Sequence, residues 1–225
     1  MVKSVGNNQL KPITILMYVP VALTIFIYYG SADYCAANLA SGDGLLSQYY
    51  YFASSFLLLG LIPILIWLFC FKGSLADLGL GLGDYKKSLI FTILGLIVMA
   101  ILAYFSSRNP AFQHEYPLFR GLINNQSNIT GYLLLYGLYY AGWEIFFRGF
   151  MLFGLRERFG ETYSILIQTI PSCLVHIGKP DAEIFSSIIA GIAFGWVAFR
   201  CRSFWPVLIS HWALGVFLDL FIIYG

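Results

Sequence analysis

Seven long apolar stretches divide the chain, and this pattern constrains the fold more than any other feature. Stretches of about 20 apolar residues are typical of helices that cross a membrane. Charged residues make up only 11% of the 225 residues, whereas a soluble domain has about 25%. We therefore expect an all-α, polytopic bundle of about seven transmembrane helices. The expected spans are Ile13–Tyr29, Tyr49–Phe71, Ser88–Phe105, Ile129–Leu155, Tyr163–Ile177, Ile184–Phe199 and Trp205–Tyr224.

The distribution of basic residues predicts the orientation of these spans. Loops that face the cytoplasm carry an excess of Lys and Arg. With the N-terminus inside, the inner segments hold nine basic residues: Lys3, Lys11, Lys72, Lys86, Lys87, Arg156, Arg158, Arg200 and Arg202. The outer segments hold three: Arg108, Arg120 and Lys179. We expect a cytoplasmic N-terminus, and the small size and basic inner loops suit a bacterial inner membrane.

Several function classes lack support in the sequence. A net charge of +2 leaves no basic footprint for nucleic acid. The Gly-rich run 78–83 lacks the Lys-Ser/Thr that a phosphate-binding loop needs. None of the four cysteines lies in a CxxC pair, so neither a disulfide framework nor a zinc knuckle is expected. The expected partners are membrane lipid and a membrane-associated peptide or protein.

Charged residues inside the fourth expected span are the informative exception to its apolar pattern. Glu144 and Arg148 lie four residues apart, so they share one helix face and can pair. A charge deep in a bilayer costs at least about 2.5–3.5 kcal/mol by insertion scales. One interpretation is a structural salt bridge whose partners reduce each other's cost.

Two histidines favour a shared polar site over that simpler interpretation. His176 ends the fifth expected span, and His211 lies inside the seventh, with Asp219 about two turns further on the same face. Counted from the inner ends at the helical rise, His211 lies about 10 Å deep, Glu144 about 16 Å and His176 about 21 Å. Three helices thus bring an ionisable group to the middle of the membrane, which predicts that these groups meet.

A carboxylate and two imidazoles suit two kinds of chemistry. The carboxylate can act as a general base on water while the histidines orient that water or stabilise an oxyanion. Alternatively, the three can bind a divalent metal that activates the water. We expect no cofactor, with zinc the less favoured alternative, because Arg148 competes with a cation for the Glu144 carboxylate.

These residues resemble the motifs of the CAAX protease and bacteriocin-processing family, also called the Abi family of intramembrane proteases. The family pattern is a Glu-Glu-x-x-x-Arg helix, a Phe-x-x-x-His helix and a His-x-x-x-Asn helix. Glu144 and Arg148 match the first motif, His176 the second and His211 the third. The resemblance covers roughly Ile129–Tyr224, so we expect N-terminal helices in residues 1–128 and a catalytic core in 129–225. It implies peptide-bond hydrolysis within the membrane.

Three departures from the pattern indicate a divergent subgroup. Trp143 stands where the first glutamate belongs, Ser172 replaces the phenylalanine and Gly215 replaces the asparagine. The missing glutamate is the one that the family usually gives the role of activating water. Glu144 could take over that role, or Glu183 could reach the site from the outer loop.

The sequence therefore predicts an intramembrane endopeptidase of the glutamic type. Glu144 would hold or activate the water, and His176 and His211 would position it and stabilise the tetrahedral intermediate. Arg148 would fix the Glu144 carboxylate, and Asp219 would orient His211. Two other classes stay open: a non-catalytic scaffold or immunity-type protein of the same fold, and a small transporter. The substrate could be a prenylated CAAX peptide, a bacteriocin leader or a membrane-protein fragment.

Overall fold

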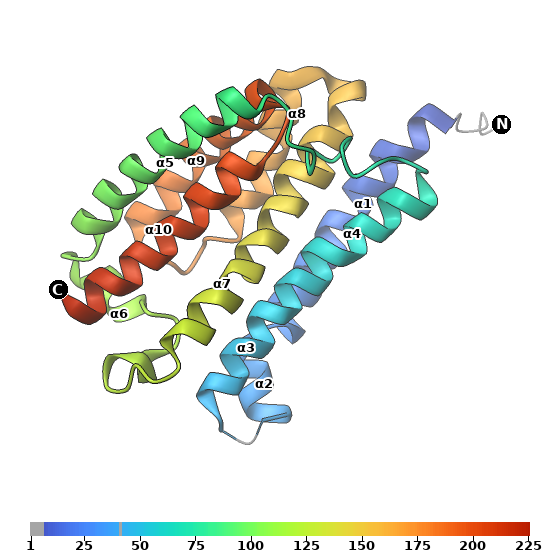
Figure 1. The fold of residues 1–225 in the computed structure, drawn as a ribbon. Coiled ribbons are helices and arrows are strands. Elements are labelled where there is room, and N and C mark those ends of the chain that lie inside the picture. Colours follow the sequence, from blue (N-terminus) through green and yellow to red (C-terminus); the bar gives the residue numbers. More distant parts are fainter. Residues whose placement is uncertain (1–6, 41) are drawn as a thin grey trace.

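The chain folds into a bundle of helices without strands in the part described here, residues 7–40 and 42–225 of a computed structural model (Figure 1). Lys3, counted above among the inner basic residues, lies outside the described residues. The elements are α1 Asn7–Tyr29, α2 Ala32–Asn38, α3 Gly44–Ser55, η1 Phe56–Leu61, α4 Ile62–Leu65, η2 Ile66–Cys70, α5 Tyr85–Ser106, α6 Pro110–Glu115, η3 Arg120–Ile123, α7 Ile129–Glu144, η4 Ile145–Phe153, α8 Gly154–Leu174, α9 Asp181–Cys201 and α10 Trp205–Tyr224. The segments η1, η2 and η4 are π-helical and continue the α-helices before them, whereas η3 is a short 3₁₀ turn.

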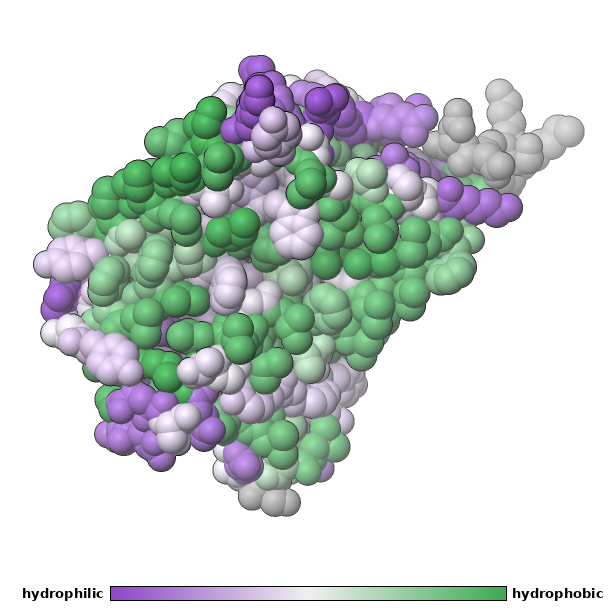
Figure 2. Space-filling model, in the orientation of Figure 1, coloured by the Kyte–Doolittle hydropathy of each residue, from purple (hydrophilic) through white to green (hydrophobic). Residues whose placement is uncertain are grey.

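Five of the described helical segments are long and apolar enough to cross a membrane, which makes the chain an integral membrane protein. They are Gln9–Tyr29, Gly44–Cys70, Tyr85–Ser106, Asp181–Cys201 and Trp205–Tyr224. The other two expected spans, Ile129–Leu155 and Tyr163–Ile177, are largely helical, but they are not among these five. The tyrosines of α7 and the polar Gln168 and Thr169 of α8 make those helices less apolar. Figure 2 shows apolar residues over most of the flank of the molecule, between two polar ends.

The segment formed by α7 and η4 runs through the interior of the bundle. It contacts α3, η1, α8 and α10, while α5 lies at the periphery against α10 (Figure 1). Small residues allow the close approach to α3 and η1, as is common where membrane helices meet. A Cβ added to Gly142 would lie 2.6 Å from the Ser55 carbonyl oxygen, and one added to Gly60 would lie 3.4 Å from the Gly142 Cα.

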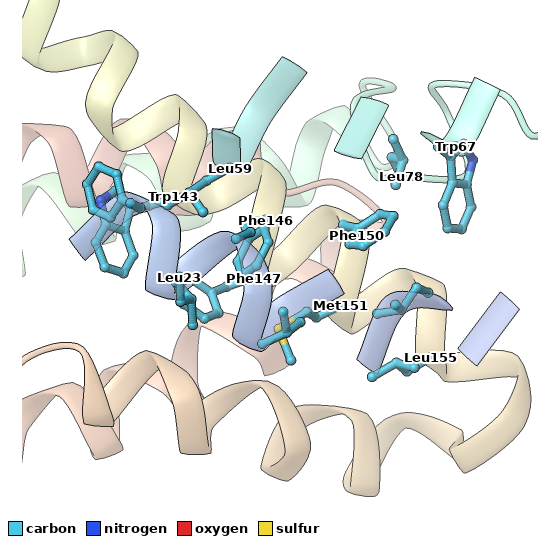
Figure 3. Close-up of a cluster of buried hydrophobic side chains, with 14 residues drawn as sticks. Leu23, Leu59, Trp67, Leu78, Trp143, Phe146, Phe147, Phe150, Met151 and Leu155 are labelled. Atoms are coloured by element: carbon cyan, nitrogen blue, oxygen red, sulfur yellow. The ribbon is translucent and has the colours of Figure 1, made fainter. Parts of the chain in front are cut away.

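A dry apolar core fills the bundle around η4. Phe146, Phe147, Phe150, Leu152 and Leu155 have no exposed surface. Most of them belong to a cluster with side chains of α1, and Figure 3 shows that cluster. Because these side chains are closely packed, this face of η4 is apolar.

The successive crossings of the helices give the molecule two ends. The connections 71–84 and 202–204 meet at one end, where the Asp84 N–H donates to the Cys201 carbonyl over 2.7 Å and the Phe204 N–H donates to the Gly79 carbonyl over 3.1 Å. The connections 30–43, 107–128 and 175–180 meet at the opposite end, which carries α2 and α6 (Figure 1). We call these the basic end and the α6 end, because the basic residues are concentrated at the first.

Candidate active site

One face of the α7–η4 segment carries a stripe of polar and aromatic residues at four-residue intervals. The stripe consists of Tyr132, Tyr136, Tyr140, Glu144 and Arg148, and all five are buried. The rings of Tyr132 and Tyr136 lie 5.6 Å apart, and those of Tyr136 and Tyr140 lie 4.8 Å apart. Side chains four apart on a helix are neighbours, so the stripe leads directly to Glu144.

The Glu144 carboxylate is the centre of the buried polar group. Its Oε1 accepts a hydrogen bond from His211 Nδ1 over 2.7 Å and another from an Arg148 guanidinium nitrogen over 3.3 Å. Glu144 has no exposed surface and Arg148 has 2%. The structure therefore pairs Arg148 with Glu144, as their spacing predicts, and brings His211 of α10 to the same oxygen. A carboxylate here only accepts, so Nδ1 of His211 carries the proton.

His211 forms part of the wall of a cavity of about 200 Å³, while Glu144 is not among the residues that line this cavity. The Tyr140 ring packs against the imidazole edge to face at 4.6 Å, and the Phe194 ring lies 5.5 Å away. With Nδ1 bonded to Glu144, Nε2 is the ring nitrogen that has no hydrogen-bond partner among the described residues. The carboxylate thus contacts the cavity wall through His211 and Arg148, which both line it.

His176 lines the same cavity from the end of α8. Its Nδ1 lies 2.6 Å from the Ser172 carbonyl oxygen, which only accepts, so Nδ1 carries the proton here too. The Trp143 ring lies 6.1 Å from the His176 ring. The two histidines and Arg148 therefore line one cavity, although they come from three segments of the chain.

Aromatic and aliphatic side chains make up most of the remaining cavity wall. None of these wall residues was predicted from the sequence to belong to the site. The four-residue spacing of the α7 tyrosines is the one sequence signal that could have indicated some of them. They are Phe26, Ile27, Tyr51, Tyr116, Leu118, Tyr136, Tyr139, Tyr140, Trp143 and Val175.

Asp219 does not contact His211, contrary to the sequence-based expectation. One of its oxygens accepts a hydrogen bond from the Tyr132 hydroxyl over 3.1 Å, and the other has no partner among the described residues. The physical reason is that Glu144 already occupies His211 Nδ1, while eight residues of helix place Asp219 about 12 Å further along α10.

Glu183 lines the cavity at the α6 end, in the first turn of α9. Its Oε1 accepts a hydrogen bond from the Tyr116 hydroxyl over 2.8 Å. Burial and the nearby Glu183 raise the pKa of Tyr116 well above its ordinary value, so this hydroxyl stays protonated and donates. Beside it, Lys179 forms an ion pair with Glu115. Glu183 is therefore part of the cavity rim and is not bonded to Glu144 or to either site histidine.

The three departures from the motif pattern have distinct surroundings. Trp143 packs in the apolar cluster of Figure 3, with its ring stacked 5.3 Å from that of Phe147. Its indole N–H is buried without a partner among the described residues. A Cβ added to Gly215 would collide with the Tyr140 hydroxyl, so the tyrosine excludes a side chain there. Ser172 contributes its backbone carbonyl, which holds His176.

No cluster of three His, Cys, Asp or Glu side chains suited to a metal ion occurs within the described ranges. The candidate ligands are instead engaged with protein groups: Glu144 with Arg148, and His176 with Ser172. The expectation of a cofactor-free reaction stays a prediction, which chelation can test.

Comparison with known proteins finds a family model that matches part of the chain. Residues 125–217 match the Rce1-like family of type II CAAX prenyl endopeptidases. This segment is an Rce1-like domain. The segment contains Glu144, Arg148, His176, Glu183 and His211. The match confirms, over residues 125–217, the family that the motifs indicate. No curated protein and no solved structure matches the chain.

Proposed function

We propose that the protein is an intramembrane endopeptidase that hydrolyses a peptide bond of a membrane-associated substrate. The observation that carries the proposal is the hydrogen-bonded His211–Glu144–Arg148 group beside a cavity that His176 also lines. The Rce1-like match supports the reaction class. The favoured setting is a bacterial inner membrane with the N-terminus in the cytoplasm.

In this mechanism His211 takes the proton from the attacking water. His211 lines the cavity, and its Nδ1–H donates to Glu144, which leaves Nε2 to accept a proton. As the water oxygen attacks the carbonyl carbon, its proton moves to Nε2, and the negative Glu144 stabilises the imidazolium that forms. Glu144 therefore acts through His211, rather than on the water directly as the sequence alone suggests.

The tetrahedral intermediate needs a group that stabilises its oxyanion. Arg148 lines the cavity, and its one hydrogen bond among the described residues is to Glu144. Its remaining N–H groups and its charge can therefore serve this role. His176, on the other wall, orients the water through its unprotonated Nε2. The C–N bond then breaks, and the imidazolium of His211 returns its proton to the leaving amine nitrogen.

Trp143 distinguishes this site from the family pattern. An indole N–H only donates, so it cannot take a proton from water as a glutamate would. This residue favours one alternative, a non-catalytic scaffold or immunity-type protein that binds a peptide in the cavity without cleaving it.

The test is cleavage of a membrane-presented peptide library by the purified protein in proteoliposomes. We expect His211→Ala and His176→Ala to lose activity while remaining folded. His114→Ala is the matched control, because His114 is the third histidine of the chain and is exposed in α6. Binding of peptides without cleavage by the unaltered protein would favour the scaffold, and equal cleavage by all variants would refute the site assignment.

A further inference from the structure

The cavity extends to one end of the molecule, the α6 end. Its rim residues belong to the connections at the α6 end or to the helix ends beside them, and they are Ile27, Ser31, Tyr116, Leu118, Lys179 and Glu183. The Tyr116–Glu183 hydrogen bond and the Lys179–Glu115 ion pair join two of these connections at the rim. A ligand reaching His211 therefore passes these residues.

The opposite direction is closed by apolar packing. From Glu144 toward the basic end, η4 presents Phe146, Phe147, Phe150 and Leu152, all without exposed surface. Phe204 is also fully buried at this end, where its backbone N–H is bonded to the Gly79 carbonyl. A peptide cannot enter through side chains packed at this density without displacing several of them.

The charges of the two ends differ in sign. The described residues of the basic end include eight Lys and Arg and four Asp and Glu: Lys11, Lys72, Lys86, Lys87, Arg156, Arg158, Arg200 and Arg202, with Asp77, Asp84, Glu157 and Glu161. The α6 end has three and five: Arg108, Arg120 and Lys179, with Asp33, Asp43, Glu115, Asp181 and Glu183. Because Lys and Arg stay on the cytoplasmic side, the basic end faces the cytoplasm and the α6 end faces away from it.

We infer that the substrate is an exported peptide, or the outer part of a membrane-anchored one, which reaches His211 from the non-cytoplasmic side. The inference rests on the proposed function and adds the side of entry and the class of substrate. A peptide confined to the cytoplasm cannot reach the cavity. The apolar walls and the excess of carboxylates at the α6 end suit a segment with large apolar side chains beside neutral or basic ones.

Cysteine labelling tests the side of entry without any assay of activity. The unaltered protein supplies its own inner control, because Cys70 is exposed at the basic end. Asn124→Cys marks the exposed loop of the α6 end, and Ser31→Cys marks the cavity rim. In intact cells we expect a membrane-impermeant maleimide to label both variants and to leave the unaltered protein unlabelled. After permeabilisation Cys70 should become reactive.

A second experiment tests the side of cleavage. Proteoliposomes are sorted by orientation with the same maleimide, and a charged, impermeant peptide that is cleaved in detergent is added outside. We expect cleavage when the α6 end faces outward and its loss when the basic end does. Cleavage from the basic side only, or labelling of Asn124→Cys only after permeabilisation, would overturn this inference and leave the proposed function intact. Absence of all cleavage, even in detergent, would overturn the proposed function and with it the assignment of a substrate, although the labelling would still report the orientation.

Discussion

His211 of α10 donates to Glu144 of α7 over 2.7 Å, and this hydrogen bond connects two helices whose residues are 67 positions apart. The bond fixes which imidazole nitrogen carries the proton, and the carboxylate itself is not among the residues that line the cavity. The same oxygen accepts from Arg148, so one atom organises the candidate catalytic group. The first two predictions follow from this relationship.

Glu144→Gln should retain the geometry of the site but lose its negative charge. We expect kcat to fall by about 10²-fold or more, with little change in KM, because the imidazolium is stabilised only during reaction. The measurement is steady-state cleavage in proteoliposomes. Glu161→Gln, the same change at an exposed ion pair with Arg156, is the control. A Glu144→Gln variant as active as this control would contradict the role of the carboxylate.

Arg148→Ala should destabilise the fold by about 3–5 kcal/mol, because it leaves Glu144 buried without its counter-charge. Unfolding in detergent measures the effect, with the exposed Arg158→Ala as control. The double variant Glu144→Gln/Arg148→Ala should lose less stability than the two single effects combined, since the unpaired charge is gone. Strict additivity would argue against a coupled pair.

Gly215→Ala should lower both activity and stability. Its Cβ would collide with the Tyr140 hydroxyl, whose ring packs on His211, and overpacking of this kind costs about 1–3 kcal/mol. Tyr140→Phe should partly rescue the variant by removing the nearest atom. Gly131→Ala is the comparison, because its Cβ would come no closer than 3.2 Å to the Tyr49 hydroxyl. Equal behaviour of the two alanine variants would refute the collision.

Asp219→Asn should leave kcat within a few-fold of the unaltered protein. Asp219 is bonded to Tyr132 and not to His211, so the amide can accept the same hydrogen bond without disturbing the site. Its effect is measured in the cleavage assay together with Glu144→Gln. A loss as large as that of Glu144→Gln would restore the expectation that Asp219 orients His211.

Activity should survive strong chelation. Arg148 occupies the carboxylate that a metal ion would need, and its positive charge repels a cation at close range. The measurement is cleavage in chelator alongside elemental analysis of the purified protein. Stoichiometric zinc whose removal stops cleavage, and whose return restores it, would require a different mechanism.

Local spacing predicted the parts of the site that lie on one helix. Glu144 and Arg148 meet because four residues bring side chains onto one face, and this follows from helical geometry. The partner of a buried group on another helix depends on packing, which spacing does not determine. Asp219 therefore has Tyr132 as its partner instead of His211, and Glu183 bonds Tyr116 at the rim instead of joining Glu144.

Apolar runs in the sequence predicted the all-α fold and most of the membrane spans. The helices inside the bundle were harder to recognise as membrane spans from their sequence. A helix enclosed by others can carry tyrosines because lipid does not surround it. Tyr132 and Tyr136 lower the apolarity of α7 for this reason, and both are almost fully buried. The same enclosure creates the cavity, whose wall combines residues as distant in sequence as Phe26 and His211.

The π-helical segment η4 begins directly after Glu144. It changes the directions in which the following side chains point around the helix axis. In an α-helix each four-residue step rotates a side chain by about 40° beyond a full turn. A π-helix closes its hydrogen bonds one residue later than an α-helix, so each turn holds more residues and the same step falls short of a full turn. The drift accumulated along the tyrosines of α7 is therefore offset between Glu144 and Arg148, and the two stay on one side of the segment, as four-residue spacing also allows in an α-helix. Deleting one residue from 149–153 would leave the spacing of Glu144 and Arg148 unchanged but rotate the end of η4 and the start of α8 relative to that pair.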